Sequence, residues 1–468
     1  MSRLRPLLIV CVVLLLVLPR AGLGRAQQAQ PAPIDFSSLE RVVLAELSET
    51  NTPGAAVGIV SGDRVIFARG FGVSDVETSA SVTPDMLFRL GSTTKMFTAA
   101  ALVKLVQEGK LRLDEPIGKY AKGLSPAIGR LTSAQLLSHT AGLKDDAVMF
   151  GKHDDAELGE TVRALKDDFV FAAPGSIFSY SNPGYWLAGY VIEQVSGRAY
   201  ADQMSESLFK PLGMERTTLR PTMAMTFPLS QGHERAGKEK PKVIRPFADN
   251  TGNWPAGSMF SSVNDLARFV IAFMNNGKLE GKPVLSPSLI AELSKPRAEV
   301  PGSDSKYGFG LSIGPLRGVH VVQHAGSRSG FGSLIRMAPE HRFAVIILIN
   351  RTGGTLNKTA EKAMELMLPL VEAKKESEPG PRTMTEAEMT RYIGVYGDVQ
   401  NRIELLMKQG QLYLKRGSQE GLVTKTGNSR FSAMIQGEAP ALEFEIVPGA
   451  DGNAEFLHIG MRAMKRVP

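Results

Sequence analysis

Strand-forming segments lie on either side of a long mixed region, and this separation most constrains the fold. Ala55 to Val60 and Val65 to Gly70 flank the turn Ser61-Gly62-Asp63, which predicts a hairpin. Four more β-rich segments follow much later, and these are Gly308 to Ile313, His320 to His324, Gly332 to Met337 and Phe343 to Asn350. We therefore expect one antiparallel sheet, closed by distant segments around a mainly helical insertion.

Helical patterns accompany both ends of the expected sheet. A first helix is predicted from about Phe36 to Leu47, and Asn357 to Val371 carries an apolar stripe typical of a helix packed on one side. Lys95 to Glu108 is rich in Ala, Leu, Val and Met, which indicates a largely buried helix. The expected fold class is α/β (α+β), with helices flanking an antiparallel sheet in a domain over residues 34–371.

A second unit follows a charged, proline-containing stretch. Residues 372–386 read as a linker, and residues 387–468 alternate apolar and polar side chains. Arg402 to Arg416 resembles a hairpin that turns at Gln409-Gly410. We expect a small all-β domain of barrel type there.

The N-terminus has the pattern of an export signal. Arg3 and Arg5 precede an apolar run of about 12 residues, too short to span a bilayer, and cleavage after Ala26 suits a signal peptide over residues 1–26. Without this segment the chain has 50 rather than 54 Lys and Arg residues and the same 47 Asp and Glu residues. Its net charge therefore falls from +7 to +3. A nucleic-acid partner is therefore not implied. Cys11 is the only cysteine, so the mature chain would have neither a disulfide nor a cysteine nucleophile.

Ser92-Thr93-Thr94-Lys95 opens the predicted buried helix. Residues three apart lie on the same side of a helix, so the lysine amine is expected within reach of the serine hydroxyl. A lysine in an apolar helix loses its proton more easily than one in water, which makes Lys95 a credible base for Ser92. The helix N-terminus would also present N–H groups to a developing oxyanion. Alone, this spacing is more typical of a capping serine followed by a lysine that reaches solvent.

Two further short motifs follow in order along the chain. In Tyr180-Ser181-Asn182, a tyrosine near a cationic lysine can be driven toward phenolate, and an asparagine amide can bind a substrate carbonyl and steady the lysine. In His324-Ala325-Gly326, the small residues let a substrate backbone approach the end of the preceding strand, and His324 can donate a hydrogen bond or share a proton. Each motif taken alone is also typical of an ordinary turn.

Together, these three elements resemble the penicillin-recognising serine hydrolases, in particular the branch with class C β-lactamases, D-alanyl-D-alanine carboxypeptidases and related esterases. The resemblance covers about residues 36–371. Its supporting segments are Phe88-Arg89-Leu90-Gly91, Leu113-Asp114-Glu115-Pro116-Ile117, Leu136-Leu137-Ser138-His139-Thr140-Ala141-Gly142-Leu143, Pro255-Ala256-Gly257 and Ser261-Ser262-Val263-Asn264-Asp265-Leu266-Ala267. The C-terminal unit resembles the lipocalin-like β-barrel appended to many members of the family.

The resemblance implies a set of roles. Ser92 would form the acyl-enzyme, Lys95 and Tyr180 would share its proton, and Asn182 would contact the substrate amide. The substrate would also meet His324 and Gly326, and the backbone N–H groups of Ser92 and Ser327 would form the oxyanion hole. No metal or organic cofactor is implied. The partner would be a peptide or small-molecule substrate outside the cytoplasm, in the periplasm or extracellular space, with no stable membrane span in the mature chain.

The substrate class stays open at this point. β-Lactamases of this branch usually carry Lys in a Lys-Thr-Gly motif where this chain has His324, whereas several peptidases and esterases carry His. Lys425-Thr426-Gly427 does occur, but it follows the linker, and we predict a hairpin turn without a catalytic role. D-Ala-D-Ala-type peptides come first, esters second and efficient β-lactam hydrolysis third. A catalytically silent binding protein on the same fold is the alternative from another class, and the oligomeric state is left open.

Overall fold

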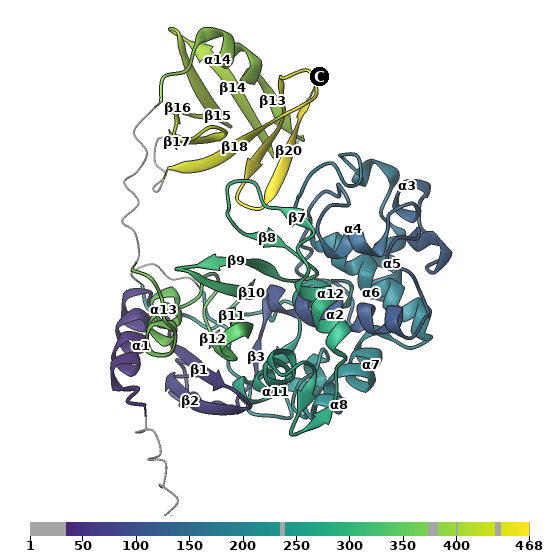
Figure 1. The fold of residues 1–468 in the computed structure, drawn as a ribbon, viewed down its shortest axis with the longest axis vertical. Coiled ribbons are helices and arrows are strands. Elements are labelled where there is room, and N and C mark those ends of the chain that lie inside the picture. Colours follow the sequence, from purple (N-terminus) through teal and green to yellow (C-terminus); the bar gives the residue numbers. More distant parts are fainter. Residues whose placement is uncertain (1–33, 235–238, 373–381, 399–400, 436–440, 468) are drawn as a thin grey trace, which may run out of the picture.

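The computed structural model describes residues 34–234, 239–372, 382–398, 401–435 and 441–467. The expected signal peptide with Cys11, and most of the expected linker, lie outside these ranges. The described chain forms a large domain built on one sheet and a closed β-barrel (Figure 1).

An antiparallel sheet of eight strands is the centre of the large domain, in the order β2-β1-β12-β11-β10-β9-β8-β7. Strand β1 pairs with β12 from Ala55 opposite Ile349 to Ser61 opposite Phe343, which confirms that distant segments close the sheet. The strands are β1 (Gly54–Ser61), β2 (Arg64–Gly72), β7 (Ala298–Glu299), β8 (Lys306–Tyr307), β9 (Ser312–Leu316), β10 (Val319–Arg328), β11 (Phe331–Ala338) and β12 (Phe343–Ile349).

Two predicted strand boundaries were wrong. The strand expected from Gly308 begins only at Ser312, because the N–H of Gly308 bonds to the carbonyl of Leu311 in a turn. The strand expected to end near His324 continues to Arg328, which pairs with Phe331 of β11. The motif at His324 therefore lies inside a strand rather than after one.

Helices cover both faces of the sheet (Figure 1). Helices α1 (Ser37–Glu49) and α13 (Asn357–Met367) pack together on one face, and α13 ends four residues before the predicted Val371. On the other face, α11 (Val263–Met274) contacts β1 and β12, and the buried helix α2 (Thr94–Gln107) packs against α12 (Pro287–Ser294). Each face has its own apolar core, so both sides of β1 are buried.

The mainly helical insertion lies between β2 and β7. Its helix α6 is the one that packs against α2. Its remaining helices are α3 (Pro126–Gly129), α4 (Ser133–Leu137), α5 (Glu157–Arg163), α6 (Asn182–Ser196), α7 (Tyr200–Met204), α8 (Lys210–Leu212), α9 (Pro221–Ala224) and α10 (Trp254–Gly257). Four short strands pair within it as β3 (Phe88–Arg89) with β4 (Phe260–Ser261), and β5 (Lys278–Leu279) with β6 (Lys282–Pro283).

The C-terminal unit is a closed barrel of eight antiparallel strands, which confirms the predicted all-β class. Helix α14 (Glu386–Tyr392) precedes it, capped by the side chain of Thr385. Residues 382–386, at the end of the expected linker, therefore belong with the barrel, and Arg382 bridges to Lys425. The strands are β13 (Gly394–Gly397), β14 (Arg402–Lys408), β15 (Gln411–Arg416), β16 (Gln419–Lys425), β17 (Arg430–Ile435), β18 (Leu442–Pro448), β19 (Ala454–Ile459) and β20 (Arg462–Val467).

The barrel contacts the large domain through the β19–β20 hairpin (Figure 1). Met461 at its turn packs against Phe178 and Tyr307, and Phe456 of β19 packs with Ile177. The C-terminal unit is thus joined to the segment just before Tyr180.

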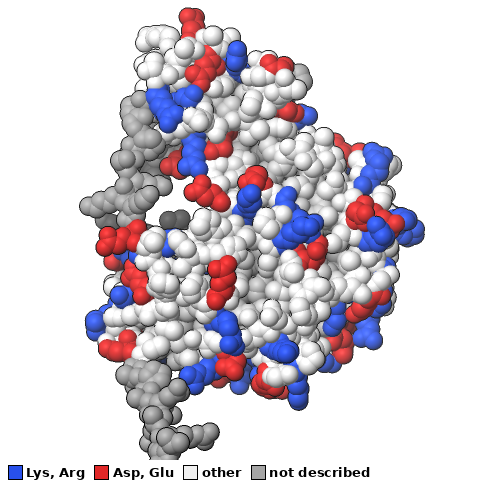
Figure 2. Space-filling model, viewed as in Figure 1, with Lys and Arg blue, Asp and Glu red and all other residues white. Residues whose placement is uncertain are grey.

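On the face drawn in Figure 2, basic and acidic side chains are interspersed rather than gathered by sign. Within the described residues, no helix has the length and apolarity needed to cross a membrane.

Candidate active site

Ser92 lies in a 3-10 turn, Gly91–Thr93, that runs directly into α2. The Nζ of Lys95 is 3.3 Å from the Oγ of Ser92, as the three-residue spacing predicted. The lysine also donates to the Oδ1 of Asn182 at 2.8 Å and to the carbonyl of Ala256 at 2.7 Å. All three hydrogens of a protonated amine would thus be used, and only the contact with Ser92 is long.

Burial dominates the electrostatics of Lys95, whose side chain is fully inaccessible to solvent. Desolvation holds the pKa of Lys95 well below its ordinary value, Asp145 raises it, and Arg462 and Arg328 lower it further. Arg328 is itself buried, and its Nε and Nη2 have no hydrogen-bond partner among the described residues. The surroundings favour a neutral Lys95 that can accept a proton.

Tyr180 stands beside this amine, with Lys95 Nζ 4.7 Å from its ring centre. The ring of His139 packs against Tyr180 at 4.1 Å, and His139 Nδ1 accepts the N–H of Ser181 at 3.1 Å. Burial raises the pKa of Tyr180, a hydrogen bond from Ser92 lowers it, and Asp145 raises it. The direction is opposite to the resting phenolate expected from the sequence, so Tyr180 is a phenol that can relay a proton.

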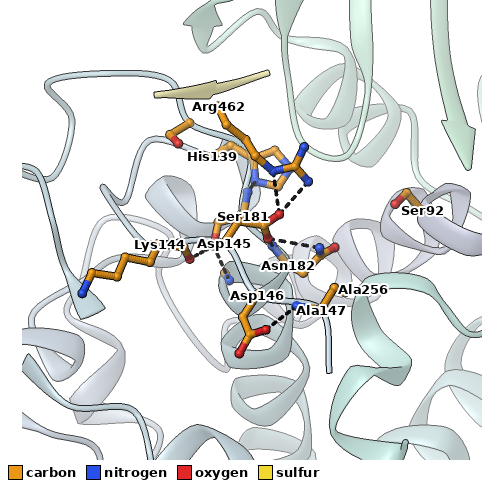
Figure 3. A network of polar contacts seen from close by, with 12 residues as sticks. Ser92, His139, Lys144, Asp145, Asp146, Ala147, Ser181, Asn182, Ala256 and Arg462 are labelled. Atoms are coloured by element: carbon orange, nitrogen blue, oxygen red, sulfur yellow. Dashed lines mark hydrogen bonds and ion pairs between the residues drawn. The ribbon is translucent and has the colours of Figure 1, made fainter. Parts of the chain in front are cut away.

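Asn182 begins α6 and joins Lys95 to a second layer of polar residues. Figure 3 shows Asp145 and Arg462 of this layer beside Asn182. Its backbone N–H and its Nδ2 both donate to the Oδ1 of Asp145, at 2.7 and 3.1 Å. The Oδ2 of Asp145 accepts from Arg462 of β20, at 2.7 Å from Nε and 2.5 Å from Nη2. A residue of the barrel thus takes part in the hydrogen-bond network that ends at Lys95.

Two glycines allow the turn of Ser92 to lie against β10. A Cβ on Gly326 would come within 2.0 Å of the carbonyl of Leu90 and 2.9 Å of the backbone N of Ser92. Gly91 has a φ of +59°, and its Cβ would meet the backbone of Ser327 at 2.6 Å. The backbone N–H groups of Ser92 and Ser327, expected to form an oxyanion hole, therefore belong to segments in close contact.

His324 is buried below the site, and both of its ring nitrogens are engaged within the protein. Nε2 lies 2.9 Å from the hydroxyl of Tyr307, and Nδ1 lies 2.5 Å from the carbonyl of Ala325. Desolvation, with a smaller effect of Lys95, lowers the pKa of His324 to about 3. His324 is therefore neutral, and its ring offers no free nitrogen to a substrate.

Sequence reasoning missed Asp145, Arg462 and the carbonyl of Ala256. The signal for Ala256 was present in Pro255-Ala256-Gly257, a family-like segment without an assigned role. Asp145 follows the family-like loop around His139, but nothing in its spacing identified it. Arg462 carried no signal, because an arginine near a hairpin turn is ordinary.

The described residues hold no group of three His, Cys, Asp or Glu side chains that could bind a metal ion. Lys425-Thr426-Gly427 lies in the barrel, where β16 ends and the N–H groups of Thr426 and Gly427 turn back to the carbonyl of Arg430. Lys425 forms an ion pair with Glu388 of α14. This motif therefore belongs to a hairpin turn, as predicted.

A sequence model of the family described as Beta-lactamase matches residues 39–367. Protein flp of Staphylococcus aureus (strain N315) is 26% identical over 332 residues, which is 69% of this chain and 64% of flp. Unguisins hydrolase ungD' of Aspergillus campestris is 30% identical over 339 residues, which is 68% of this chain and 62% of that protein. The chain thus matches less than two thirds of the length of either relative.

A solved crystal structure of SurE matches the fold with a TM-score of 0.76 and 25% identity. The match covers 92% of this chain and 98% of the SurE chain, so the likeness extends beyond the large domain into the barrel. The two-unit architecture is therefore shared with a known structure.

Proposed function

This chain belongs to the β-lactamase family of penicillin-recognising serine hydrolases, and we propose that it is an exported hydrolase that works through an acyl-enzyme on Ser92. The observation that carries this proposal is the contact of a fully buried lysine amine with the Ser92 hydroxyl, 3.3 Å away. Burial lowers the pKa of Lys95, which makes it a readier proton acceptor than a lysine in water.

The first half of the reaction is acylation. Neutral Lys95 takes the Oγ proton while Oγ bonds to the substrate carbonyl carbon. The resulting oxyanion accepts hydrogen bonds from the N–H groups of Ser92 and Ser327. When the tetrahedral intermediate collapses, the scissile bond breaks and the proton passes from Lys95, through Tyr180, to the leaving amine.

The second half is deacylation, in which water replaces the leaving group. The same base takes a proton from the water as its oxygen attacks the ester carbon. Collapse of this intermediate returns the proton to Oγ of Ser92 and releases the carboxylic acid. Asn182, which Lys95 and Asp145 hold in place, is the residue that we propose contacts the substrate amide.

We propose peptide-like substrates of the D-Ala-D-Ala type, or β-lactams, as the class that this site accepts. Neutral His324 supplies no cation for a substrate carboxylate at the position where β-lactamases of this branch carry lysine. This argues against efficient β-lactam turnover, and a peptide that ends in D-Ala-D-Ala, which also carries a carboxylate, would have to be held by other donors. The name of the Aspergillus relative, an unguisins hydrolase, is consistent with hydrolytic chemistry in the family.

Esters are the second candidate, because the same lysine-activated serine attacks any reactive acyl group and an ester needs no cation at position 324. The deciding experiment is labelling of the purified protein with a fluorescent penicillin, read by intact mass, beside Ser92→Ala. One adduct that is absent from the variant supports a Ser92 acyl-enzyme that admits a β-lactam. Hydrolysis of a nitrophenyl ester without labelling supports an esterase, and silence in both assays supports a non-catalytic binding protein.

We also propose export to the periplasm or the extracellular space. Its support is the arginine-flanked apolar run near the N-terminus, with small residues before Gln27. Mass spectrometry of the protein recovered from the culture medium or the cell envelope tests it. A mature chain that begins at Gln27 is expected, and a chain found only inside cells with Met1 retained contradicts export.

A further inference from the structure

We propose that Arg462, supplied by the C-terminal barrel, is a positioning residue of the active site, which holds the Asp145 carboxylate and through it the side-chain amide of Asn182 against Lys95. This inference rests on the proposed function of Ser92 and Lys95. It gives the barrel a part in catalysis rather than a role as an attached module. Figure 3 shows Asp145 between Arg462 and Asn182.

The first link is a fork of two donors on one carboxylate oxygen. Nε and Nη2 of Arg462 both lie within 2.7 Å of Oδ2 of Asp145. Two donors on one oxygen fix the place of that oxygen, and the two donors of Asn182 on Oδ1 complete the orientation of the carboxylate. The other oxygen of Asp145 is thereby directed at Asn182.

The second link sets the orientation of an amide that has two chemically different ends. An ionised carboxylate only accepts hydrogen bonds, so the end of Asn182 that faces Asp145 must be the NH₂ group, as the 3.1 Å contact has it. The carbonyl end then faces Lys95, whose amine donates to it at 2.8 Å. A flipped amide would place NH₂ against the lysine amine and lose both bonds.

The third link holds Arg462 itself in register. The carbonyl of Met461 accepts the N–H of Tyr180 at 2.7 Å, and the N–H of Ala463 donates to Oγ of Ser179 at 3.1 Å. The two neighbours of Arg462 are therefore bonded to the irregular segment that leads into Asn182. Its guanidinium also lies 5.4 Å from the ring centre of Tyr180. The hairpin and the catalytic segment are thus fixed to each other on both sides of Arg462.

Stability alone does not account for this contact. The Arg462 side chain is 52% exposed and Asp145 is 16% exposed, and ion pairs as accessible as this contribute little to folding. Arg430 and Glu445 form a matched pair in the same barrel, 55% and 13% exposed, which has no contact with the catalytic residues. Comparison of the two arginines separates positioning from general stabilisation of the barrel.

The test measures the single-turnover rate of Ser92 acylation, by fluorescent penicillin or nitrophenyl ester, in the full-length mature protein. Arg462→Ala is expected to slow acylation roughly 10-fold, because small displacements of catalytic groups are costly, and Arg430→Ala is expected to leave the rate unchanged. The double variant Arg462→Ala/Asp145→Asn should be no slower than the slower single variant, since both remove the same link. Melting temperatures identify any variant that fails to fold.

A pH profile of acylation supplies a readout that a purely structural role would not move. The charged or titratable groups that face Lys95 are Asp145, Arg462, Arg328, His139, His324, Tyr180 and Tyr185. Arg462 lowers the pKa of Lys95 and Asp145 raises it, whereas burial lowers the pKa of both histidines and raises that of both tyrosines, so these four stay neutral. On the acid side of the profile, called the acid limb here, the rate falls as Lys95 becomes protonated. The acid limb should therefore move to higher pH in Arg462→Ala and to lower pH in Asp145→Asn.

Three outcomes overturn the proposal. These are an unchanged acylation rate in Arg462→Ala, an equal loss in Arg430→Ala, or shifts of the acid limb in the same direction in both active-site variants. Failure of the proposed function looks different, because the unaltered protein would then not be acylated at all. In that case a change in Asn182 orientation is still detected as a chemical-shift change of its side-chain amide in Arg462→Ala, and no such change in a folded variant also contradicts positioning.

Discussion

The side-chain amine of Lys95 donates a hydrogen bond of 2.7 Å to the backbone carbonyl of Ala256, at the end of α10. This bond and the 2.8 Å bond to Asn182 leave the lone pair of a neutral amine as the group that meets Ser92. The base is thus oriented by two acceptors before a substrate arrives, and neither acceptor carries a charge.

Replacement of this base should remove activity and also reduce stability. In Lys95→Ala we expect acylation to fall by about 10²- to 10⁴-fold, which is the usual contribution of a positioned base. Asn182 Oδ1 and the carbonyl of Ala256 would lose a buried donor, at a cost of about 1–3 kcal/mol each. Ester hydrolysis and urea unfolding measure the two effects. A variant of full activity would exclude Lys95 as the base.

Close contact between β10 and the turn of Ser92 predicts an effect of a single methyl group. Gly326→Ala would place a Cβ 2.0 Å from the carbonyl of Leu90, so the backbone must shift, at a cost of about 1–3 kcal/mol. Because Ser92 N is also within contact, we expect acylation to slow by roughly 100-fold. Gly129→Ala, where a Cβ meets only an atom at 3.8 Å, is the matched control and should leave both quantities unchanged.

Acidification should destabilise the protein through His324 and His458, both held neutral. Burial lowers the pKa of His324 to about 3 and that of His458 to about 4. The unfolded chain binds these protons near pH 6.5, so the stabilisation is fully present above that pH and is lost as pH falls toward 3. Urea unfolding at pH 7.5 and 4.5 measures the loss. In His324→Gln the difference between the two pH values should be smaller, and an unchanged difference would contradict a neutral His324.

The second Lys-Thr-Gly segment should be irrelevant to catalysis. Lys425→Ala removes a largely buried ion pair with Glu388 inside the barrel unit, and we expect a loss of stability of about 1–3 kcal/mol. The acylation rate should match that of the unaltered protein. A tenfold fall in rate with an intact fold would show that this hairpin takes part in the site.

The spacing of short motifs predicted the core of the site because local geometry decides it. Ser92 and Lys95 meet through one turn of helix, and the hairpin around Gln409-Gly410 follows from turn chemistry. The contribution of the barrel was not predictable in this way. Alternation of apolar and polar residues indicates strands, but it does not say which hairpin faces another domain, so Arg462 was not identified.

Charge effects were also only partly accessible from the sequence. The low pKa of Lys95 follows from an apolar helix, as expected. The raised pKa of Tyr180 depends on how completely the surrounding rings exclude water, and it reversed the expected phenolate. His324 is likewise an internal residue, because β10 continues past it and the hydroxyl of Tyr307 bonds to its Nε2.

The pairing of β1 with β12 has a consequence for how the chain is made. Strand β1 is buried along nearly its whole length, yet its neighbour is contributed by the segment Phe343–Ile349, which is synthesised after the entire helical insertion. Pairing across so long a loop is slow, and an apolar strand with an unpaired edge is prone to associate with other chains in the meantime. Newly made protein therefore has a long interval in which the edge of β1 that will meet β12 is unpaired.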